Sequence, residues 1–239
     1  MPDTSTDNPL TIVIFGASGA TGKAAIAAAR DRGHRVRAVD HHVPEDTGDD
    51  PMVTHVEGDV LKDDLRPHVR GADAVLSCLG VGNDPATLLD PPPLYTDGTE
   101  AICDAMAAEG VERLVVISAS FVENKDRGPI WFKLPAMVAL SRVFEEMRRM
   151  EEMLRARPQI DWTAVRPGWL MEGDATGDAT VQADVIPQGM IRTRHGDLAA
   201  FMVSLAETGD WSRATPAIAR REGPCATSPM AVLEEMLPS

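Results

Sequence analysis

Residues 12–23 read IVIFGASGATGK, an apolar run that breaks into three regularly spaced glycines and leads into an alanine-rich segment. This pattern predicts a strand, a tight turn and the start of a helix. Gly16 lets the chain turn where a Cβ would clash, Gly19 lets backbone amides approach a ligand, and Gly22 lets the helix pack closely on the strand. The free N–H groups and positive dipole end of such a helix favour a pyrophosphate. The stretch therefore predicts dinucleotide binding, the alternative being an ordinary structural turn.

Composition limits the classes of partner. The chain has 239 residues, of which 44% are hydrophobic and 25% are charged, values typical of a soluble globular domain. The net charge of -14, without a basic stripe, argues against a nucleic-acid partner. No apolar run reaches the ~18 residues that a membrane span needs. We expect a small-molecule substrate, no nucleic-acid or membrane partner, and either a monomer or a homodimer.

The N-terminus and the cysteines bear on the compartment. Residues 1–9 are polar and acidic, without the basic and apolar regions of a signal peptide, and predict a disordered leader. Cys78, Cys103 and Cys225 lie in apolar contexts and lack C-x-x-C spacing. They predict buried, reduced thiols rather than a disulfide framework or a zinc site. We therefore expect a cytoplasmic protein without a metal site.

Strands and helices alternate along the chain. We predict strands at about residues 12–15, 34–39, 52–56, 72–79, 111–118 and 161–166, and helices at about 20–32, 96–109, 137–157 and 197–207. Shorter strand-like pieces lie near 181–186 and 190–193. This order predicts an α/β fold with one doubly wound parallel sheet. Residues 10–239 would form a single domain, with 170–239 contributing a small substrate lobe.

Asp40 closes the second predicted strand, where a dinucleotide-binding fold hydrogen-bonds the adenosine ribose. Its charge would repel a 2′-phosphate, which favours NAD over NADP. His41 and His42 follow, and Arg35 and Arg37 lie on the same strand, so basic groups that could face a phosphate are also present. We predict NAD(P) binding with a preference for NAD, and include His41 in the site. A solvated loop acid is the alternative for Asp40.

Other strand ends carry further candidates. Asp59 could accept a hydrogen bond from the adenine amino group, or cap a helix beginning near Lys62. Leu79 and Gly80 follow a nearly all-apolar strand, where glycine lets the backbone run along a cofactor or simply turn. Their position at strand ends places these residues on the edge of the sheet where the glycine turn lies.

Ser118 ends the fifth predicted strand, beside the expected nicotinamide position. It is our first candidate for polarising a substrate carbonyl, and Ser120 is the second; a structural cap is the alternative. Hydride transfer itself needs no side-chain acid, because the cofactor carries the chemistry and the protein supplies position and excludes water.

An apolar pocket for a flat substrate is a further part of the predicted site. Residues 129–135 read as a lid or a pocket wall. Four large side chains could line the pocket or belong to the core: Trp131, Met137, Trp169 and Met171. His195 is expected at a helix N-terminus rather than in a metal site, because no second ligand stands at useful spacing.

Five segments in this order resemble the atypical short-chain dehydrogenase/reductase group of NmrA-like proteins and biliverdin reductase B-like flavin reductases. They are GASGATG at 16–22, EGDV at 57–60, ADAVLSCLG at 72–80, VERLVVIS at 111–118 and DWTAVRPG at 161–168. The resemblance covers about residues 10–207. It implies a Rossmann domain with a small C-terminal substrate lobe and NAD(P) along the strand ends. The contacts that it implies are Ser18, Gly19, Ala20 and Thr21 to the pyrophosphate, Asp59 and Val60 to adenine, Leu79 and Gly80 near the ribose, and Pro167, Gly168 and Trp169 at the nicotinamide.

The chain departs from this group at the proton relay. Many short-chain dehydrogenases use a Tyr-x-x-x-Lys pair on the helix after the fifth strand. The single tyrosine here, Tyr95, precedes that strand, and the pair aligns with Val143 and Met147. Trp169 also stands where the flavin reductases carry a histidine, and His41 where they carry an arginine. The exact substrate and the NADP preference of that group are therefore not transferred.

These observations predict an NAD(P)-dependent reductase that passes a hydride to a small or flat, electron-poor acceptor such as a flavin, a quinone or a tetrapyrrole. The alternative is a non-catalytic, NmrA-like sensor of the nicotinamide pool that acts through a protein partner. Sugar epimerase or dehydratase chemistry is disfavoured, because it uses the absent relay.

Overall fold

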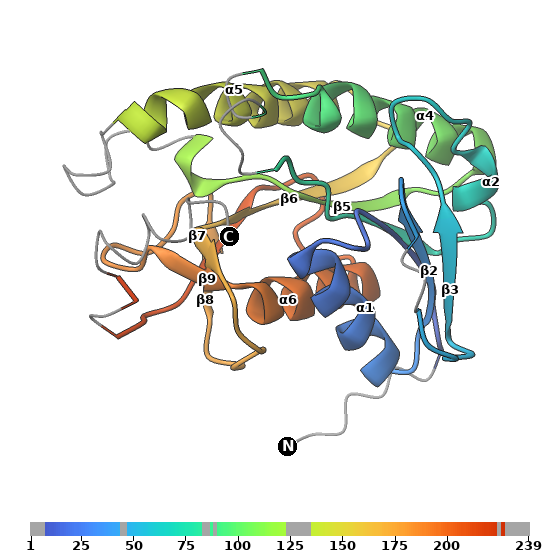
Figure 1. The fold of residues 1–239 in the computed structure, drawn as a ribbon, viewed down its shortest axis with the longest axis horizontal. Coiled ribbons are helices and arrows are strands. Elements are labelled where there is room, and N and C mark those ends of the chain that lie inside the picture. Colours follow the sequence, from blue (N-terminus) through green and yellow to red (C-terminus); the bar gives the residue numbers. More distant parts are fainter. Residues whose placement is uncertain are drawn as a thin grey trace.

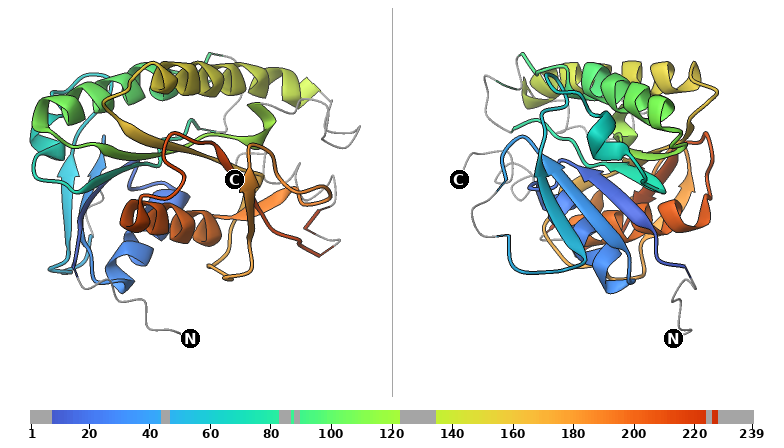
Figure 2. Two further views of the ribbon diagram at one scale, coloured as in Figure 1. Left: turned by 180° about the vertical axis from the view of Figure 1, so that it is seen from behind. Right: turned by 90° about the vertical axis from the view of Figure 1, so that its right-hand side faces the viewer.

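A central sheet lies between two layers of helices in the computed structural model of the protein (Figure 1, Figure 2). The structure describes residues 8–43, 47–82, 87, 90–122, 135–223 and 226–227. Most of the predicted leader, the 129–134 part of the predicted lid with Trp131, the side chain of Met137, and Cys225 lie outside the described residues. No helix in the described ranges is long and apolar enough to cross a membrane.

The main sheet has the strand order β3-β2-β1-β4-β5-β6-β10-β8. Its strands are β1 (Thr11–Phe15), β2 (Arg35–Asp40), β3 (Val53–Glu57), β4 (Ala74–Ser77), β5 (Arg113–Ile117), β6 (Asp161–Pro167), β8 (Thr180–Ala183) and β10 (Pro216–Ala219). All neighbouring pairs are parallel except β10 with β8. The order in which strands are added to the sheet reverses between β1 and β4, which is the point where Rossmann-type folds bind their ligands.

Helices cover both faces of this sheet. On one face α1 (Ala20–Asp31) packs against α6 (His195–Thr208). On the other lie α2 (Arg66–Val69), α4 (Thr99–Glu109) and α5 (Pro135–Arg155), with the π-helical turn η1 (Leu94–Gly98) leading into α4. A separate pair, β7 (Trp169–Met171) and β9 (Arg192–Arg194), runs parallel beside the main sheet. The short turn η2 (Ser120–Val122) follows β5.

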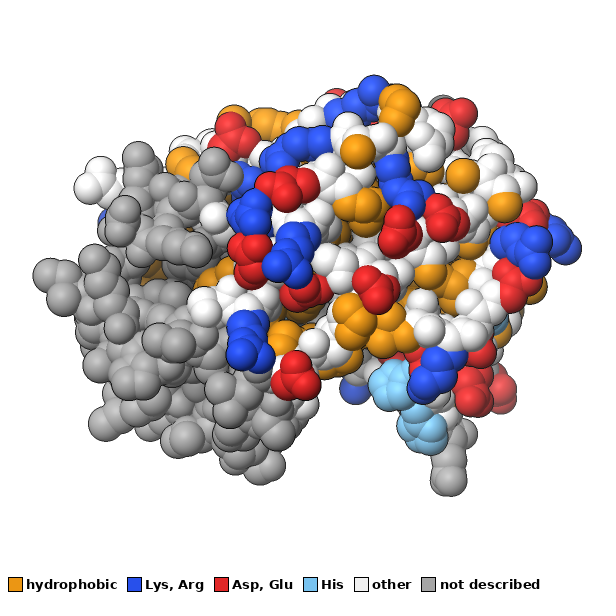
Figure 3. Space-filling view, turned by 90° about the horizontal axis from the view of Figure 1, so that it is seen from above, with side chains coloured by type: hydrophobic (Ala, Val, Ile, Leu, Met, Phe, Trp, Pro, Cys, Tyr) orange, Lys and Arg blue, Asp and Glu red, His pale blue; other side chains and the backbone are white. Residues whose placement is uncertain are grey.

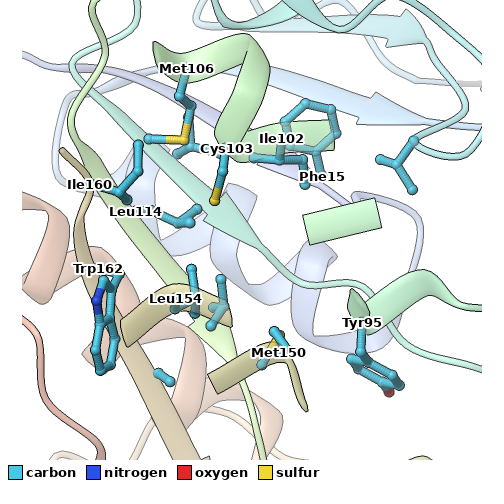
Figure 4. Packing of buried hydrophobic residues seen from close by; sticks show 14 of the residues in the cluster. Phe15, Tyr95, Ile102, Cys103, Met106, Leu114, Met150, Leu154, Ile160 and Trp162 are labelled. Atoms are coloured by element: carbon cyan, nitrogen blue, oxygen red, sulfur yellow. The ribbon is translucent and has the colours of Figure 1, made fainter. Parts of the chain in front are cut away.

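The central strands are apolar on both faces because both faces are covered. In β1, Ile12 and Ile14 belong to the core cluster under α1 and α6, whereas Val13 and Phe15 belong to the cluster under α4 and α5. Figure 4 shows Phe15 and Ile102 of α4 among the side chains of this second cluster. Because side chains alternate along a strand, the single apolar run of β1 contributes to the cores on both faces of the sheet.

The predicted α/β fold is confirmed, with three corrections to its details. The edge strand β8 is antiparallel, so the sheet is mostly rather than wholly parallel. The predicted helix near Lys62 is a turn, and helical structure begins only at Arg66. The range 170–239 is not a lobe throughout, because α6 packs on α1 and β10 extends the main sheet beside β6.

The outer face of α5 carries the charge pairs that its sequence predicts. Arg148 contacts Glu145 one turn before it and Glu152 one turn after it. Figure 3 shows Lys or Arg side chains alternating with Asp or Glu over this side of the molecule. Such exposed pairs contribute little to stability.

Arg113 makes a different kind of contact. Its side chain is buried, and its guanidinium donates to the carbonyl oxygens of Leu205 (2.9 and 3.1 Å) and Asp210 (3.0 Å). Leu205 lies in the last turn of α6, and its carbonyl oxygen also accepts from the capping amide of Gly209 at 3.1 Å. The arginine therefore holds the C-terminal end of α6 on β5.

We expect Arg113→Met to lower the free energy of unfolding by about 2–4 kcal/mol, because buried carbonyls lose a charged donor. Urea unfolding measures this loss. Arg148→Met, which removes an exposed arginine, should cost less than about 0.5 kcal/mol. Equal losses in the two variants would contradict the assigned role of Arg113.

Candidate active site

One cavity of about 1040 Å³ lies along the carboxyl ends of the parallel strands. Residues that end β1, β2, β4, β5 and β6 line it, together with parts of α5, η1 and β7. Small-molecule sites usually measure about 300–1,000 Å³. This cavity is therefore large enough for a dinucleotide and a second small molecule.

The cavity brings nearly all the predicted site residues together. Those that line it are Gly16, Ser18, Gly19, Ala20, Thr21, Asp40, His41, Asp59, Val60, Leu79, Gly80, Ser118, Pro167, Gly168 and Trp169. Gly22 and Ser120 do not line it. Gly22 instead has the packing role that the glycine spacing predicts. Ser120 was the second catalytic candidate, and its position outside the cavity argues against that role.

The glycine turn is held by close backbone contacts. A Cβ on Gly16, whose φ is +73°, would lie 2.6 Å from the carbonyl oxygen of Cys78. A Cβ on Gly22 would lie 2.1 Å from the carbonyl oxygen of Gly16. At Gly19 the corresponding distance is 3.4 Å, an ordinary contact. Gly16 and Gly22 are therefore required for packing, whereas a side chain at Gly19 would enter the cavity.

Backbone hydrogen bonds show which amides of the turn can meet an anion. The amide of Gly19 donates to Gly16, and the amide of Ser18 donates to the carboxylate of Asp40. The amides of Ala20 and Thr21 are in the first turn of α1, where N–H groups lack acceptors within the helix. That turn holds no acidic residue. The cradle thus fits a pyrophosphate, with Ala20 and Thr21 rather than the Ser18 amide as its donors.

Asp40 is the main charged group at the β2 end of the cavity. Its Oδ2 accepts hydrogen bonds from the amide (2.9 Å) and hydroxyl (2.8 Å) of Ser18, and its Oδ1 lies 2.8 Å from Nδ1 of His41. Burial alone would raise the pKa of Asp40, but the two hydrogen bonds from Ser18 and the neighbouring His41 together lower it. Asp40 is therefore a carboxylate that both fixes the glycine turn and lines the cavity.

Asp59 forms a local turn at the same end. Its carboxylate contacts Nζ of Lys62 (2.6 Å) and accepts from the amide of Leu61 (2.9 Å). These two hydrogen bonds lower the pKa of Asp59. The structure thus agrees with a turn-capping role while keeping Asp59 on the cavity wall.

Among the described residues, lysine and arginine side chains lie outside the cavity. A separate hollow of about 150 Å³ lies on the other side of Ser18 and Asp40, and Lys23 and His55 line it. The β2 end of the cavity therefore presents carboxylates and His41 to a ligand.

The opposite end of the cavity is apolar. From α5 it takes Leu140, Val143, Phe144 and Met147, and from β7 it takes Trp169, Leu170 and Met171. Val143 and Met147, where a Tyr/Lys relay would stand, are 4% and 7% exposed. Neither side chain can move a proton. Trp169 and Met171 thus line the cavity, and their role toward a flat substrate stays a prediction.

Tyr95 and Cys78 also line the cavity, and neither ionises near neutral pH. Burial raises the pKa of Tyr95 to about 12, although a hydrogen bond with the backbone of Val81 opposes this rise. Burial likewise raises the pKa of Cys78 to about 12. Cys78 and Cys103 are free, buried thiols, as the sequence predicts.

The two candidate serines make different contacts. Ser118 lines the cavity, and its hydroxyl donates to Oε1 of Glu151 at 2.8 Å. Ser120 is equally buried, and its hydroxyl donates to the carbonyl oxygen of Arg166 at 2.8 Å. Ser120 therefore has a structural partner outside the cavity. Ser118 remains the candidate, with its proton already committed to Glu151.

His195 begins α6, as predicted, and also reaches the glycine turn. Its Nδ1 lies 2.7 Å from Oγ1 of Thr21, and both residues line the cavity. No sequence pattern predicts this contact, because the two residues lie 174 positions apart. The first turns of α1 and α6 consequently meet at the cavity.

Further lining residues were not predicted as part of the site: Leu94, Tyr95, Leu140, Phe144, Glu172 and His195. The apolar members lie on elements that sequence patterns place in the core. A helical spacing that puts Leu140, Val143, Phe144 and Met147 on one face was the available signal, but it does not separate a cavity wall from a core.

Residues 16–208 match the profile of the family described as NAD(P)H-binding. The chain belongs to this NAD(P)H-binding family. The match begins at the first glycine of the turn and ends with α6, so it contains the cavity-lining ends of β2, β4, β5 and β6. The predicted resemblance to atypical short-chain dehydrogenases is thereby confirmed, and NAD(P)H binding is a property of the family.

Individual relatives are more distant. An uncharacterized chloroplastic protein of Arabidopsis thaliana is 27% identical over 186 residues, which span 75% of this chain and 66% of that protein. An uncharacterized sugar epimerase of Bacillus subtilis, YhfK, is 23% identical over 86% of this chain and 92% of its own length.

Solved structures show the shared fold. A proposed NADH–flavin reductase of Streptococcus pneumoniae has a TM-score of 0.71 at 19% identity, covering 89% of this chain and 100% of its own. The anaerobilin reductase ChuY of Escherichia coli O157:H7 has a TM-score of 0.66 at 21% identity, covering 87% and 96%.

Substitutions of Gly22 and Gly19 should affect different properties, stability for the first and NADH affinity for the second. Gly22→Ala should destabilise the protein by more than about 3 kcal/mol, because its Cβ would meet a backbone oxygen that cannot move aside. Gly19→Ala should unfold near the wild-type temperature but bind NADH at least about tenfold more weakly, since its methyl group would project toward the cavity. Thermal melts and NADH titrations separate the effects. A Gly19→Ala protein that binds NADH normally would contradict this assignment of the cradle.

Proposed function

We propose that the protein is an NAD(P)H-dependent reductase that transfers a hydride to a flat, electron-poor acceptor without a Tyr/Lys relay. The observation that supports this most strongly is the continuity of the cavity. One space joins the glycine cradle to the apolar wall formed by α5 and β7. A cofactor and an acceptor could therefore meet there without leaving the protein.

Each part of the cavity would have a distinct task. Reduced nicotinamide, when bound, supplies the hydride. The amides of Ala20 and Thr21 would hold the pyrophosphate, and Pro167 and Gly168 would border the nicotinamide. Val143, Met147 and Trp169 would exclude water and press a flat ring into position. The proton that completes the reduction would come from solvent, because a flavin, quinone or tetrapyrrole does not need a protein acid at the moment of transfer.

The adenosine end favours NADH over NADPH in this proposal. Asp40 is ionised at neutral pH, since its pKa is lowered, and it lines the cavity. A 2′-phosphate beside this carboxylate would be repelled. Among the residues that line the described cavity there is no Lys or Arg to offset that repulsion.

A non-catalytic, NmrA-like sensor is the second candidate, and the apolar relay positions favour it. With Val143 and Met147 in place of Tyr and Lys, the cavity could bind a cofactor without turning it over. Val143 and Met147 also argue against a sugar epimerase activity like the one in the name of the Bacillus relative, because sugar epimerisation by these enzymes needs the relay.

The two candidates differ in one assay. Oxidation of NADH and NADPH is followed by absorbance at 340 nm with FMN, menadione and biliverdin as acceptors. The reductase proposal expects turnover with at least one acceptor and a higher kcat/KM for NADH than for NADPH. Tight binding of a cofactor without any turnover would favour the sensor and overturn the reductase.

Asp40→Asn tests the cofactor preference while keeping acceptors for Ser18. It should raise NADPH affinity relative to NADH by about tenfold, because one carboxylate beside the 2′-phosphate loses its charge. Asp64→Asn is the control, since Asp64 is an exposed carboxylate that does not line the cavity. If both variants give the same NADPH/NADH ratio as the wild type, Asp40 does not set the preference.

A further inference from the structure

A buried ion pair lies directly behind the apolar end of the cavity. Glu151 of α5 and Arg166 of β6 are each 1% exposed. The guanidinium donates to Oε1 (2.9 Å) and Oε2 (2.6 Å) of the carboxylate. Glu151 follows Val143 and Met147 at helical spacing, so it lies on the face of α5 that borders the cavity.

All the acceptor positions of Glu151 are filled. Oε1 accepts from Arg166 and from the Ser118 hydroxyl (2.8 Å), and Oε2 accepts from Arg166 and from Arg155 (3.1 Å). A carboxylate has two acceptor sites on each oxygen. Four donors on two oxygens leave no place for a proton on Glu151, which can therefore only accept.

The hydrogen bond between Ser118 and Glu151 consequently has one direction. Because Glu151 cannot donate, the single hydroxyl proton of Ser118 must point at Oε1. The lone pairs of Ser118 Oγ are then its remaining hydrogen-bonding capacity, and no donor from the described residues contacts them. Ser118 lines the cavity while only 1% exposed, so a ligand that packs against its Oγ would meet an acceptor and not a donor.

We propose that Ser118, held by Glu151 and Arg166, is a hydrogen-bond acceptor that selects substrates with an N–H group at this position. This inference rests on the proposed reductase function and narrows its substrate class. It reverses the role that the sequence suggested, because a serine whose proton is committed cannot polarise a substrate carbonyl. Glu151 is a positioning residue, since it acts on the ligand through Ser118.

The preferred acceptors are flat heterocycles with an imide, lactam or pyrrole N–H, such as flavins and open-chain tetrapyrroles. A quinone presents carbonyl oxygens alone, and these would meet the Ser118 oxygen without a proton between them. Two hydrogen-bond acceptors that face each other in a buried site, with no donor between them, are unfavourable. Quinones are therefore expected to be the poorer substrates.

Riboflavin and 3-methylriboflavin test the inference, because they share one ring system and differ in the imide N–H. Binding of each to the protein saturated with NAD⁺ is measured by quenching of flavin fluorescence, and kcat/KM is measured with NADH. The wild type should prefer riboflavin by about three- to tenfold in both measurements. This comparison needs no variant to fold.

Ser118→Ala should bring that ratio close to one, because it removes the acceptor and makes room for the methyl group. Ser120→Ala is the matched control, since this serine is equally buried at the same strand end but does not line the cavity. It should keep the wild-type ratio.

Three results would overturn the inference: equal binding of the two flavins by the wild type, binding of neither, or a ratio unchanged by Ser118→Ala. A Ser118→Ala protein that loses affinity for NADH while keeping the flavin ratio would also overturn it, since the ligand of Ser118 would then be the nicotinamide amide. If both flavins are reduced equally well, the reductase proposal stands and only the inference about Ser118 fails. If the protein binds riboflavin more tightly but reduces neither flavin, only the reductase proposal fails.

Discussion

The close approach of α1 to the turn after β1 is the constraint on which the site depends. A Cβ added at Gly22 would lie only 2.1 Å from the carbonyl oxygen of Gly16, so only glycine fits at this position. This contact sets the helix directly behind the strand end, so the amides of Ala20 and Thr21 open into the cavity. Ser18 then ties the turn to Asp40 on the neighbouring strand. Packing and ligand recognition thus share one short segment.

Buried polar contacts organise the other end of the cavity. Glu151 joins α5 to β5 through Ser118 and to β6 through Arg166. A buried ion pair costs desolvation energy and is weak support for stability by itself. Here it fixes a proton direction at the cavity wall. The apolar Val143 and Met147 beside it make that wall dry, which strengthens any hydrogen bond formed with Ser118.

The glycine turn, the alternation of strands and helices and the strand-end residues were all predictable, because each depends on local patterns. Apolar runs such as 12–15 need cover on both faces, and parallel strands place their ends on one edge. The family match and the cavity confirm this arrangement. The antiparallel β8 was not predictable, since its four residues are partly exposed and lack a clear period.

By itself the sequence determined the fold class and predicted which strand ends would face a dinucleotide, since spacing along the chain controls turns, helix starts and strand burial. Only the tertiary structure decided what the side chains at that site can do. Ser118 meets Glu151 across 33 positions of sequence, and Thr21 meets His195 across 174. The direction of a hydrogen bond depends on every donor around its acceptor, and those donors come together only when α5, β5 and β6 pack.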